Sequence, residues 1–355
     1  MVRLQAFGKT MAVLGVALAA AVAVCLLPEN PYQRWQLLDG TIHGRARWIY
    51  ERTHFDPTPI DVAFVGPSRM GTGINAPRME KELAAAGTSA HVVNFSLPEG
   101  GRNIADVIVE EMLSEKTPKL LVIGVIEKPS RFGHPAYKYI APASLLAAPG
   151  YAGNIQYFNN LLYLPYRKMR LGVADLSPGL AGLTKAFDRA RYGGSSVDTT
   201  GNLVRADGTV VDRSVPAPLP QLNQGVETLE RGTVPPILSA RYADVEFGDE
   251  RHYVRRIVRA ARANGVPVAF LFIPYYTGPS KVQEADFYNR YGALWNAGFL
   301  ASHEEWYVDY AHLTTVGAEQ LTDWVAPQVA ARLRQSGESY EPQPAAAPRG
   351  DRPGQ

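Results

Sequence analysis

Residues 61–69 read DVAFVGPSR, an apolar strand that runs straight into a tight turn. Only valine, alanine and phenylalanine occupy positions 62–65, which is typical of a short strand buried on both faces of a sheet. Gly66-Pro67 then ends the strand, and Ser68 follows on the turn before a helix starts. In α/β folds the loops after the strands line the ligand crevice. We therefore expect the Ser68 hydroxyl to point into such a crevice.

Strand and helix patterns alternate after this first strand. Residues 76–86 have helical periodicity with Asn75 as a suitable N-cap, and residues 102–115 form a second amphipathic helix. Short apolar runs at 91–95 and 119–126 predict the second and third strands. Such alternation is typical of βαβ units. The fold class predicted is α/β with a central parallel sheet.

A long insertion, residues 129–245, interrupts the alternation after the third strand. It is rich in Gly, Pro, Tyr and Asn, and it contains a hairpin that turns on Asp207-Gly208. A stretch of this length is too long for a plain loop, so we expect it to cover the sheet and shape a cleft. The elements predicted beyond it are a helix at 249–264, a fourth strand at 266–273, a helix at 286–296, a short fifth strand at 305–308 and a last helix from about 315.

Composition and charge exclude some classes of protein. The 355 residues are 46% hydrophobic and 20% charged, which fits a globular protein with a sizeable core. The 36 basic and 34 acidic side chains give a net charge of +2, so no nucleic-acid partner is expected. The only cysteine is Cys25, so no intramolecular disulfide forms.

The N-terminus predicts a membrane anchor. No charge occurs between Lys9 and Glu29, and about 20 apolar residues are enough for a helix to cross a bilayer. The basic residues before this stretch favour residues 1–9 in the cytoplasm and residues 10–28 as the membrane span. A cleaved signal peptide is the alternative, because small residues at 19–23 offer a cleavage site. Either interpretation places the rest of the chain outside the cytoplasm.

The remaining chain divides into three parts by composition. Residues 29–59 are expected to form a linker, and residues 60–334 the α/β domain with its insertion. Residues 335–355 are rich in Ser, Gly, Pro and Ala, and we expect this tail to be disordered.

A second motif lies before the last helix, Asp309-Tyr310-Ala311-His312. A serine hydroxyl is a weak nucleophile until a neighbouring base accepts its proton. His312 is the natural base for Ser68, and Asp309 is placed to orient the imidazole. The predicted catalytic residues are therefore Ser68, His312 and Asp309.

Two other interpretations of these motifs stay open. Ser68 can be a helix cap, and Asp309 and His312 can form an ordinary surface turn. The glycines Gly66, Gly71 and Gly73 can also form a phosphate-binding loop, although their spacing does not match Gly-x-Gly-x-x-Gly.

The chain resembles the SGNH (GDSL-type) hydrolase superfamily, and within it the membrane-anchored, envelope-facing proteins related to alginate O-acetylation and DltD-type teichoic-acid proteins. The resemblance rests on residues 66–69 (GPSR) as the nucleophile block, residues 94–101 (NFSLPEGG) as the glycine block and residues 309–312 (DYAH) as the terminal block. It spans about residues 60–334. It implies a flavodoxin-like three-layer α/β/α domain in the periplasm, anchored in the inner membrane, with Ser68 as nucleophile.

The resemblance also implies an oxyanion hole. Its backbone donors would be the N–H groups of Ser68 and of Gly100 or Gly101. The superfamily adds an asparagine after the third strand, but Glu127 stands in that region and cannot donate when ionised. The side chains considered as substitutes and substrate contacts are those of Arg69, Asn94 and Asn103.

Aromatic residues suggest weak contacts to sugars. Tyr275 and Tyr276 follow the fourth strand on the same sheet edge as Ser68, and residues 151–158 form a second aromatic segment. The six histidines other than His312 show no metal-ligand spacing, so neither a metal nor a cofactor is expected.

The leading hypothesis is an extracytoplasmic serine esterase or O-acyltransferase that acts on acyl esters of an envelope glycan through an acyl-serine intermediate. By resemblance, the partners are the membrane, the glycan and the envelope polysaccharide machinery. A non-enzymatic scaffold in envelope assembly is the alternative, and a nucleotide-binding protein is the third.

Overall fold

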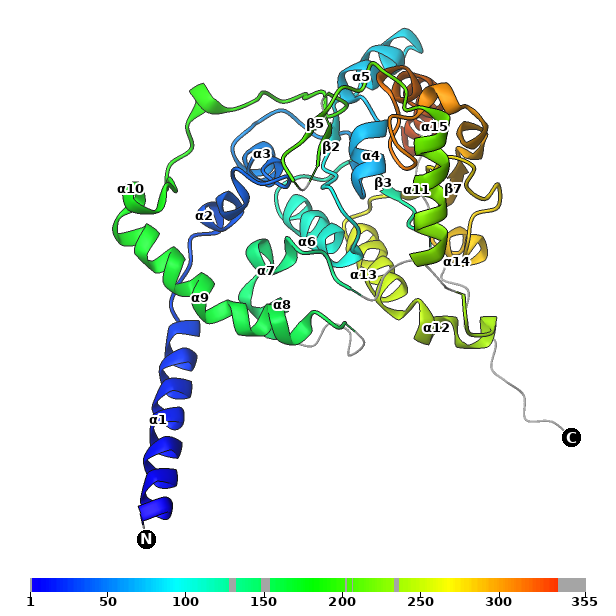
Figure 1. Ribbon diagram of the computed structural model, residues 1–355. Coiled ribbons are helices and arrows are strands. Elements are labelled where there is room, and N and C mark those ends of the chain that lie inside the picture. Colours follow the sequence, from blue (N-terminus) through cyan, green and yellow to red (C-terminus); the bar gives the residue numbers. More distant parts are fainter. Residues whose placement is uncertain are drawn as a thin grey trace, which may run out of the picture.

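The computed structural model describes residues 2–127, 132–147, 154–201, 203–205, 207–232 and 236–337. Its centre is a five-stranded parallel sheet with the strand order β2-β1-β3-β6-β7 (Figure 1). The strands are β1 (Val62–Val65), β2 (Val92–Asn94), β3 (Leu120–Gly124), β6 (Val268–Phe272) and β7 (Ala293–Asn296). The predicted α/β class with a central parallel sheet is confirmed.

Alternate residues of each strand enter separate cores on opposite faces of the sheet. In β1, Ala63 and Val65 belong to one core and Val62 and Phe64 to the other. This follows because successive side chains of a strand point to opposite faces. All four are at most 1% exposed, which explains why the strand reads as apolar throughout.

Helices cover both faces and complete a three-layer α/β/α arrangement (Figure 1). The first layer contains α3 (Arg45–His54), α6 (Arg102–Leu113) and α13 (Gly248–Ala263). The second contains α4 (Ser68–Gly73), α5 (Ala76–Ala85) and α15 (Thr315–Gly337). The Asn75 side chain caps α5 as predicted, because it accepts a hydrogen bond from the N–H of Arg78.

The strand order fixes where a ligand site is expected. Strands β4 and β5 form a separate hairpin, so the five strands of the main sheet, renumbered in chain order, have the doubly wound order 2-1-3-4-5. The switch point of that order lies between the first and third strands, where the connections leave toward opposite faces. Ser68 follows β1 after two residues, so it lies at this switch point.

The insertion consists mainly of helices, of which α9 and α11 are the longest. Its elements are α7 (Tyr137–Ile140), α8 (Ala143–Ala147), α9 (Tyr157–Leu176), α10 (Pro178–Ala181), the strands β4 (Leu203–Val204) and β5 (Val210–Val211), α11 (Leu219–Gly232) and α12 (Ala243–Glu246). The antiparallel pairing of β4 with β5 confirms the hairpin predicted around Asp207-Gly208.

The N-terminal helix α1 (Val2–Cys25) projects from the body (Figure 1). Its segment Phe7–Cys25 is long and apolar enough to cross a membrane, and none of it is buried in the protein. The next residues, expected as a linker, instead pack on the first core as α2 (Pro31–Trp35) and α3. Trp35 is fully buried, so this stretch is part of the folded body.

The fifth strand was predicted wrongly. Residues 286–296 contain a short helix, α14 (Ala285–Asn289), followed by β7, whereas Glu304–Trp306 forms a 3-10 turn. Phe287, Tyr291 and Trp295 are spaced four residues apart, which is the pattern of one face of a helix, and this spacing led to the prediction of one long helix. Gly292 marks the break, because a Cβ there would lie 2.1 Å from the Val268 carbonyl oxygen. The last eighteen residues of the predicted tail lie outside the described residues.

Candidate active site

The turn after β1 brings Ser68 to the imidazole of His312. The Ser68 Oγ lies 2.8 Å from His312 Nε2, although the two residues are remote in the chain. Ser68 is the first residue of α4 and is only partly buried. The first N–H groups of a helix have no partner within the helix, so the Ser68 N–H needs a partner from outside α4.

Asp309 fixes the orientation of His312. Its two carboxylate oxygens lie 2.9 and 3.0 Å from His312 Nδ1. Oδ1 also accepts the backbone N–H groups of Ala311 and His312, each at 2.9 Å. A carboxylate at Nδ1 keeps the proton on that nitrogen, so Nε2 is the acceptor for the Ser68 hydroxyl.

Electrostatics keep Asp309 ionised. Burial alone would raise its pKa, but the hydrogen bond and charge of the His312 ring and the two backbone N–H groups outweigh burial, so the pKa lies below the ordinary value for aspartate. The three predicted residues thus lie in one row, from carboxylate through imidazole to hydroxyl.

Arg213, which was not predicted from the sequence, links the segment that carries His312 to the helix that carries Ser68. Its guanidinium donates to the Leu313 carbonyl through Nε at 2.9 Å and to the Thr72 carbonyl through Nη2 at 2.7 Å. Leu313 follows His312, and Thr72 belongs to the helix of Ser68. Burial lowers the pKa of Arg213 to about 10, so it stays charged at neutral pH. Through Arg213, the insertion therefore helps to hold Ser68 and His312 in place.

Helix α11 lies directly over the Asp309–His312 loop. A Cβ at Gly225 would come within 2.5 Å of the Tyr310 ring, so only glycine permits this approach. The strap before the helix adds a backbone bond from Ala217 N–H to the Tyr307 carbonyl, 2.8 Å long. Part of the insertion thus covers the predicted catalytic loop.

The predicted tyrosines after β6 reach the same loop. The Tyr276 N–H donates to the Tyr310 carbonyl at 2.8 Å, and the Tyr276 ring packs edge-on against Tyr307. The Tyr275 hydroxyl donates to Glu230 on α11. Both tyrosines are more than nine-tenths buried, so they offer little open ring surface for a sugar to stack on.

Arg69, the residue after the serine, forms a two-pronged ion pair with Glu127. Its Nη1 donates to a Glu127 carboxylate oxygen at 2.9 Å and to the Ile273 carbonyl at 2.6 Å, and its Nη2 donates to the second Glu127 oxygen. Burial would lower the pKa of Arg69, but Glu127 outweighs it and raises the pKa. Of the five N–H groups of a guanidinium, two stay uncommitted to these partners.

The two candidate asparagines lie inside the protein. The Asn94 amide donates to the carbonyls of Met70 at 3.0 Å and Ile74 at 2.9 Å, so it anchors α4 from below. Asn103 accepts the His134 N–H at 2.8 Å through Oδ1. Neither side chain is exposed at all, so both position backbone rather than face a ligand.

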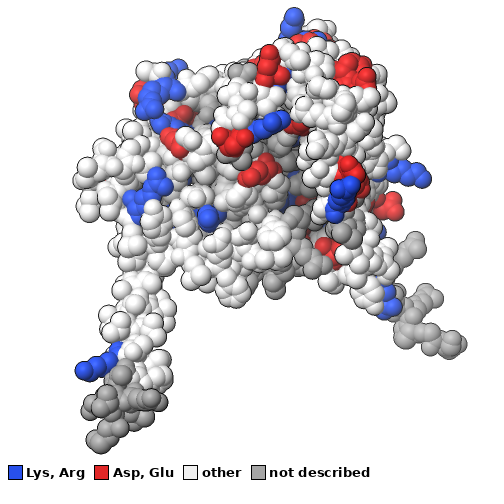
Figure 2. Space-filling model, viewed as in Figure 1, with Lys and Arg blue, Asp and Glu red and all other residues white. Residues whose placement is uncertain are grey.

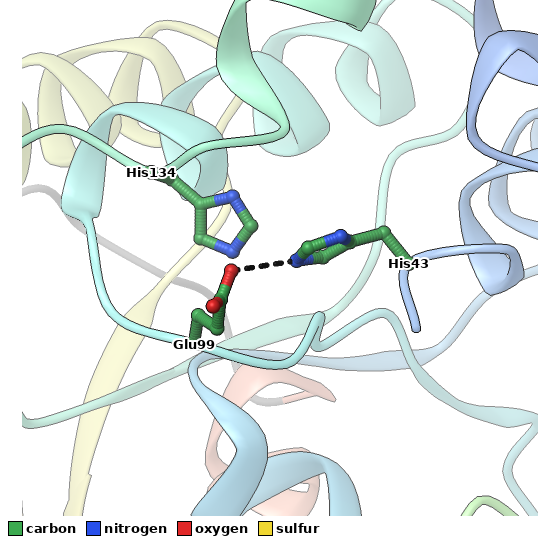
Figure 3. A group of neighbouring side chains, drawn as sticks. All are labelled: His43, Glu99 and His134. Atoms are coloured by element: carbon green, nitrogen blue, oxygen red, sulfur yellow. Dashed lines mark ion pairs between the residues drawn. The ribbon is translucent and has the colours of Figure 1, made fainter. Parts of the chain in front are cut away.

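The glycine block is held by a cluster of His43, Glu99 and His134 (Figure 3). His43 Nε2 lies 3.1 Å from a Glu99 oxygen, and His134 Nε2 lies 2.5 Å from the Pro98 carbonyl. A Cβ on Gly101 would collide with the His134 backbone at 2.3 Å. The loop that carries the proposed glycine donors is therefore fixed by contacts that the sequence did not reveal.

This cluster is a weak metal site despite its ligand types. The potential ligand atoms lie within 4.8 Å of one another. However, His134 Nδ1 accepts the Ala136 N–H at 3.1 Å, which places the ring proton on Nε2 and toward the Pro98 carbonyl. A metal needs a free nitrogen lone pair, and His134 offers none in this arrangement.

Comparison with known proteins gives no family assignment. No protein-family model matches the chain. A search of curated proteins also finds no match. What the chain does must therefore be argued from its own fold and geometry.

Proposed function

We propose that the chain is a membrane-anchored, extracytoplasmic serine esterase or O-acyltransferase of the SGNH type. The observation that carries the proposal is the row formed by Asp309, His312 and Ser68 at the switch point of a doubly wound sheet. A hydroxyl, an imidazole and a carboxylate in hydrogen-bond contact are the arrangement that activates serine in unrelated folds.

In this mechanism Ser68 Oγ attacks the carbonyl carbon of an acyl ester while His312 Nε2 accepts the hydroxyl proton. His312 then returns that proton to the leaving alkoxide, and the acyl group stays on Ser68. Asp309 stabilises the imidazolium in both steps. Water completes hydrolysis, or a sugar hydroxyl completes transfer, with the proton again passing through His312.

The oxyanion that forms when Ser68 attacks the ester carbonyl must be stabilised by hydrogen-bond donors. The Ser68 N–H at the start of α4 is one, and backbone N–H groups of the glycine block are the second. Arg69 is the proposed replacement for the superfamily's asparagine, because it follows Ser68 directly in the chain and Glu127 keeps its guanidinium charged.

An envelope glycan is the proposed substrate class, by the resemblance of the three sequence blocks. The N-terminal apolar helix supports it, because an uncleaved anchor would keep the enzyme at the membrane surface with its domain in the periplasm.

The test is ester hydrolysis by the purified full chain, with an aryl acetate and with acetylated polysaccharides as substrates. Ser68→Ala and His312→Ala are each expected to lower kcat by at least about a thousandfold. The matched control is Ser302→Ala, an exposed serine outside the row. Equal rates for wild type and Ser68→Ala would refute the nucleophile.

A scaffold role is the second candidate, and it is favoured by Glu127, which stands in the region where the superfamily has its asparagine donor. The Glu127 carboxylate is paired with Arg69 and cannot itself donate to an oxyanion. A scaffold would show no hydrolysis in vitro. Cells that carry Ser68→Ala together with His312→Ala would then have the same envelope as wild-type cells.

A further inference from the structure

Helix α9 has a buried inner face of mixed polarity and an exposed outer face that is apolar. The inner face packs on the body with buried side chains: Asn160, Leu164, Arg167, Lys168, Leu171 and Ala174. The outer stripe consists of six large apolar residues, each about half or more exposed: Phe158, Leu162, Tyr166, Met169, Val173 and Leu176. Their spacings of four, four, three, four and three residues put them within an arc of about 80° on the helix.

The outer stripe is long and uninterrupted by charge. The twenty residues of α9 extend over about 30 Å. Ile155 before the helix and Leu180 after it, 58% and 85% exposed, continue the apolar surface at both ends. Single exposed apolar residues are ordinary, but a contiguous strip of this length marks a contact surface.

The position of α9 indicates what covers the stripe. Lys168 Nζ donates to the Leu27 carbonyl at 2.7 Å, two residues beyond the end of α1. Glu29 lies 3.1 Å from Arg167 and 3.1 Å from Arg34, and all three side chains are at least nine-tenths buried. This buried ion cluster fixes α9 to the chain at the point where the apolar span ends.

The figures agree with this arrangement. In Figure 1, α9 runs across the end of α1 on the side of the body from which α1 projects, while α4 and α15 lie at the opposite end. Figure 2 shows mostly uncharged side chains on this end of the body. If α1 spans the bilayer, α9 lies at the boundary between lipid and water.

We infer that α9 is an interfacial helix whose outer stripe is immersed in the lipid surface. This inference rests on the membrane anchor proposed above. An interfacial helix buries its apolar face at the headgroup boundary, and aromatic residues such as Phe158 and Tyr166 favour that depth. The usual polar face of such a helix is replaced here by the contact with the body. The domain is thereby held at a fixed tilt, with the Ser68 end directed away from the bilayer.

The test uses the full chain in phospholipid vesicles at a low protein-to-lipid ratio. In a Cys25→Ser background, an environment-sensitive fluorophore is attached to Leu162→Cys or Val173→Cys on the stripe. Thr228→Cys on the exposed side of α11 is the aqueous control, and Leu14→Cys within α1 is the anchor control. Each label is quenched in turn by spin-labelled lipid and by iodide.

The stripe labels are expected to be quenched by lipid at least about twofold more than the Thr228 label, because interfacial helices bury their apolar face about 5–10 Å deep. Stripe labels as open to iodide as Thr228, with Leu14 still quenched by lipid, would overturn the inference and leave the anchor standing. Protection from both quenchers would assign the stripe to a second copy of the chain and also overturn it. A Leu14 label open to iodide would refute the anchor itself and, with it, the reason for placing α9 in lipid.

Discussion

Replacing Asp309 by asparagine perturbs the site with the least change in shape. Oδ1 of Asp309 is held by the N–H groups of Ala311 and His312, and an amide NH2 cannot accept those bonds. The asparagine oxygen must therefore keep that place, and its NH2 must take the Oδ2 position, 3.0 Å from His312 Nδ1. There it donates to Nδ1, so the ring proton moves to Nε2, which can no longer accept the proton of Ser68.

The expected loss in kcat is about ten thousandfold, the size of the wrong-tautomer effect known for a Ser-His-Asp protease, and equals about 5.5 kcal/mol. The assay is initial-rate hydrolysis of an aryl acetate at neutral pH. Because both backbone bonds to Oδ1 survive, Asp309→Asn should lower the melting temperature only by the contribution of the ionised carboxylate, and the variant should stay folded under the assay conditions. Glu305→Gln, which alters an exposed carboxylate on the same segment, is the matched control.

A rate for Asp309→Asn within tenfold of wild type would refute the reasoning, provided that Ser68→Ala is inactive. It would mean that His312 does not depend on this carboxylate for its tautomer. A large loss of melting temperature in the same variant would instead show that the carboxylate mainly stabilises the loop.

Three further results are expected. The lowered pKa of Asp309 means that its contribution to stability is complete above about pH 4 and is lost as the pH falls further. In urea unfolding between pH 3 and 5, the free energy of unfolding should therefore fall less steeply with decreasing pH for Asp309→Asn than for wild type. Glu250→Gln leaves the buried Arg102 without its counter-ion and should lower the free energy of unfolding by about 3–5 kcal/mol. A loss below about 1 kcal/mol in denaturant unfolding would show that other groups compensate the charge of Arg102. Gly225→Ala should push α11 away from the Asp309–His312 loop and change KM or kcat, whereas Gly232→Ala, where the added Cβ meets open space, should not. Equal kinetics for the two variants would contradict the covering role of α11.

The sheet could be predicted because its signals are local. Strands β1, β3 and β6 are apolar runs ended by glycine or proline, and the parallel sheet that buries them demands that composition. Strand β7 was missed because its residues Leu294 and Trp295 fall in helical register with the aromatic residues before them. Tertiary pairing with β6 overrode that local pattern.

The three residues of the row could be predicted because each has a motif around it. Their supports could not, because they join segments far apart in the chain. Arg213 has no sequence signature, and its role depends on where the insertion folds back. The pairing of Arg69 with Glu127 and of His43 with Glu99 likewise depends on the packed fold.

The central claim is that Ser68 is a nucleophile activated by His312. The most direct measurement is the intact mass of the full chain after treatment with a fluorophosphonate, followed by mapping of the modified peptide. One adduct on the Ser68 peptide is predicted, absent from Ser68→Ala and strongly slowed in His312→Ala. A chain that stays unmodified, or an adduct that persists at the same rate in Ser68→Ala, would contradict the account.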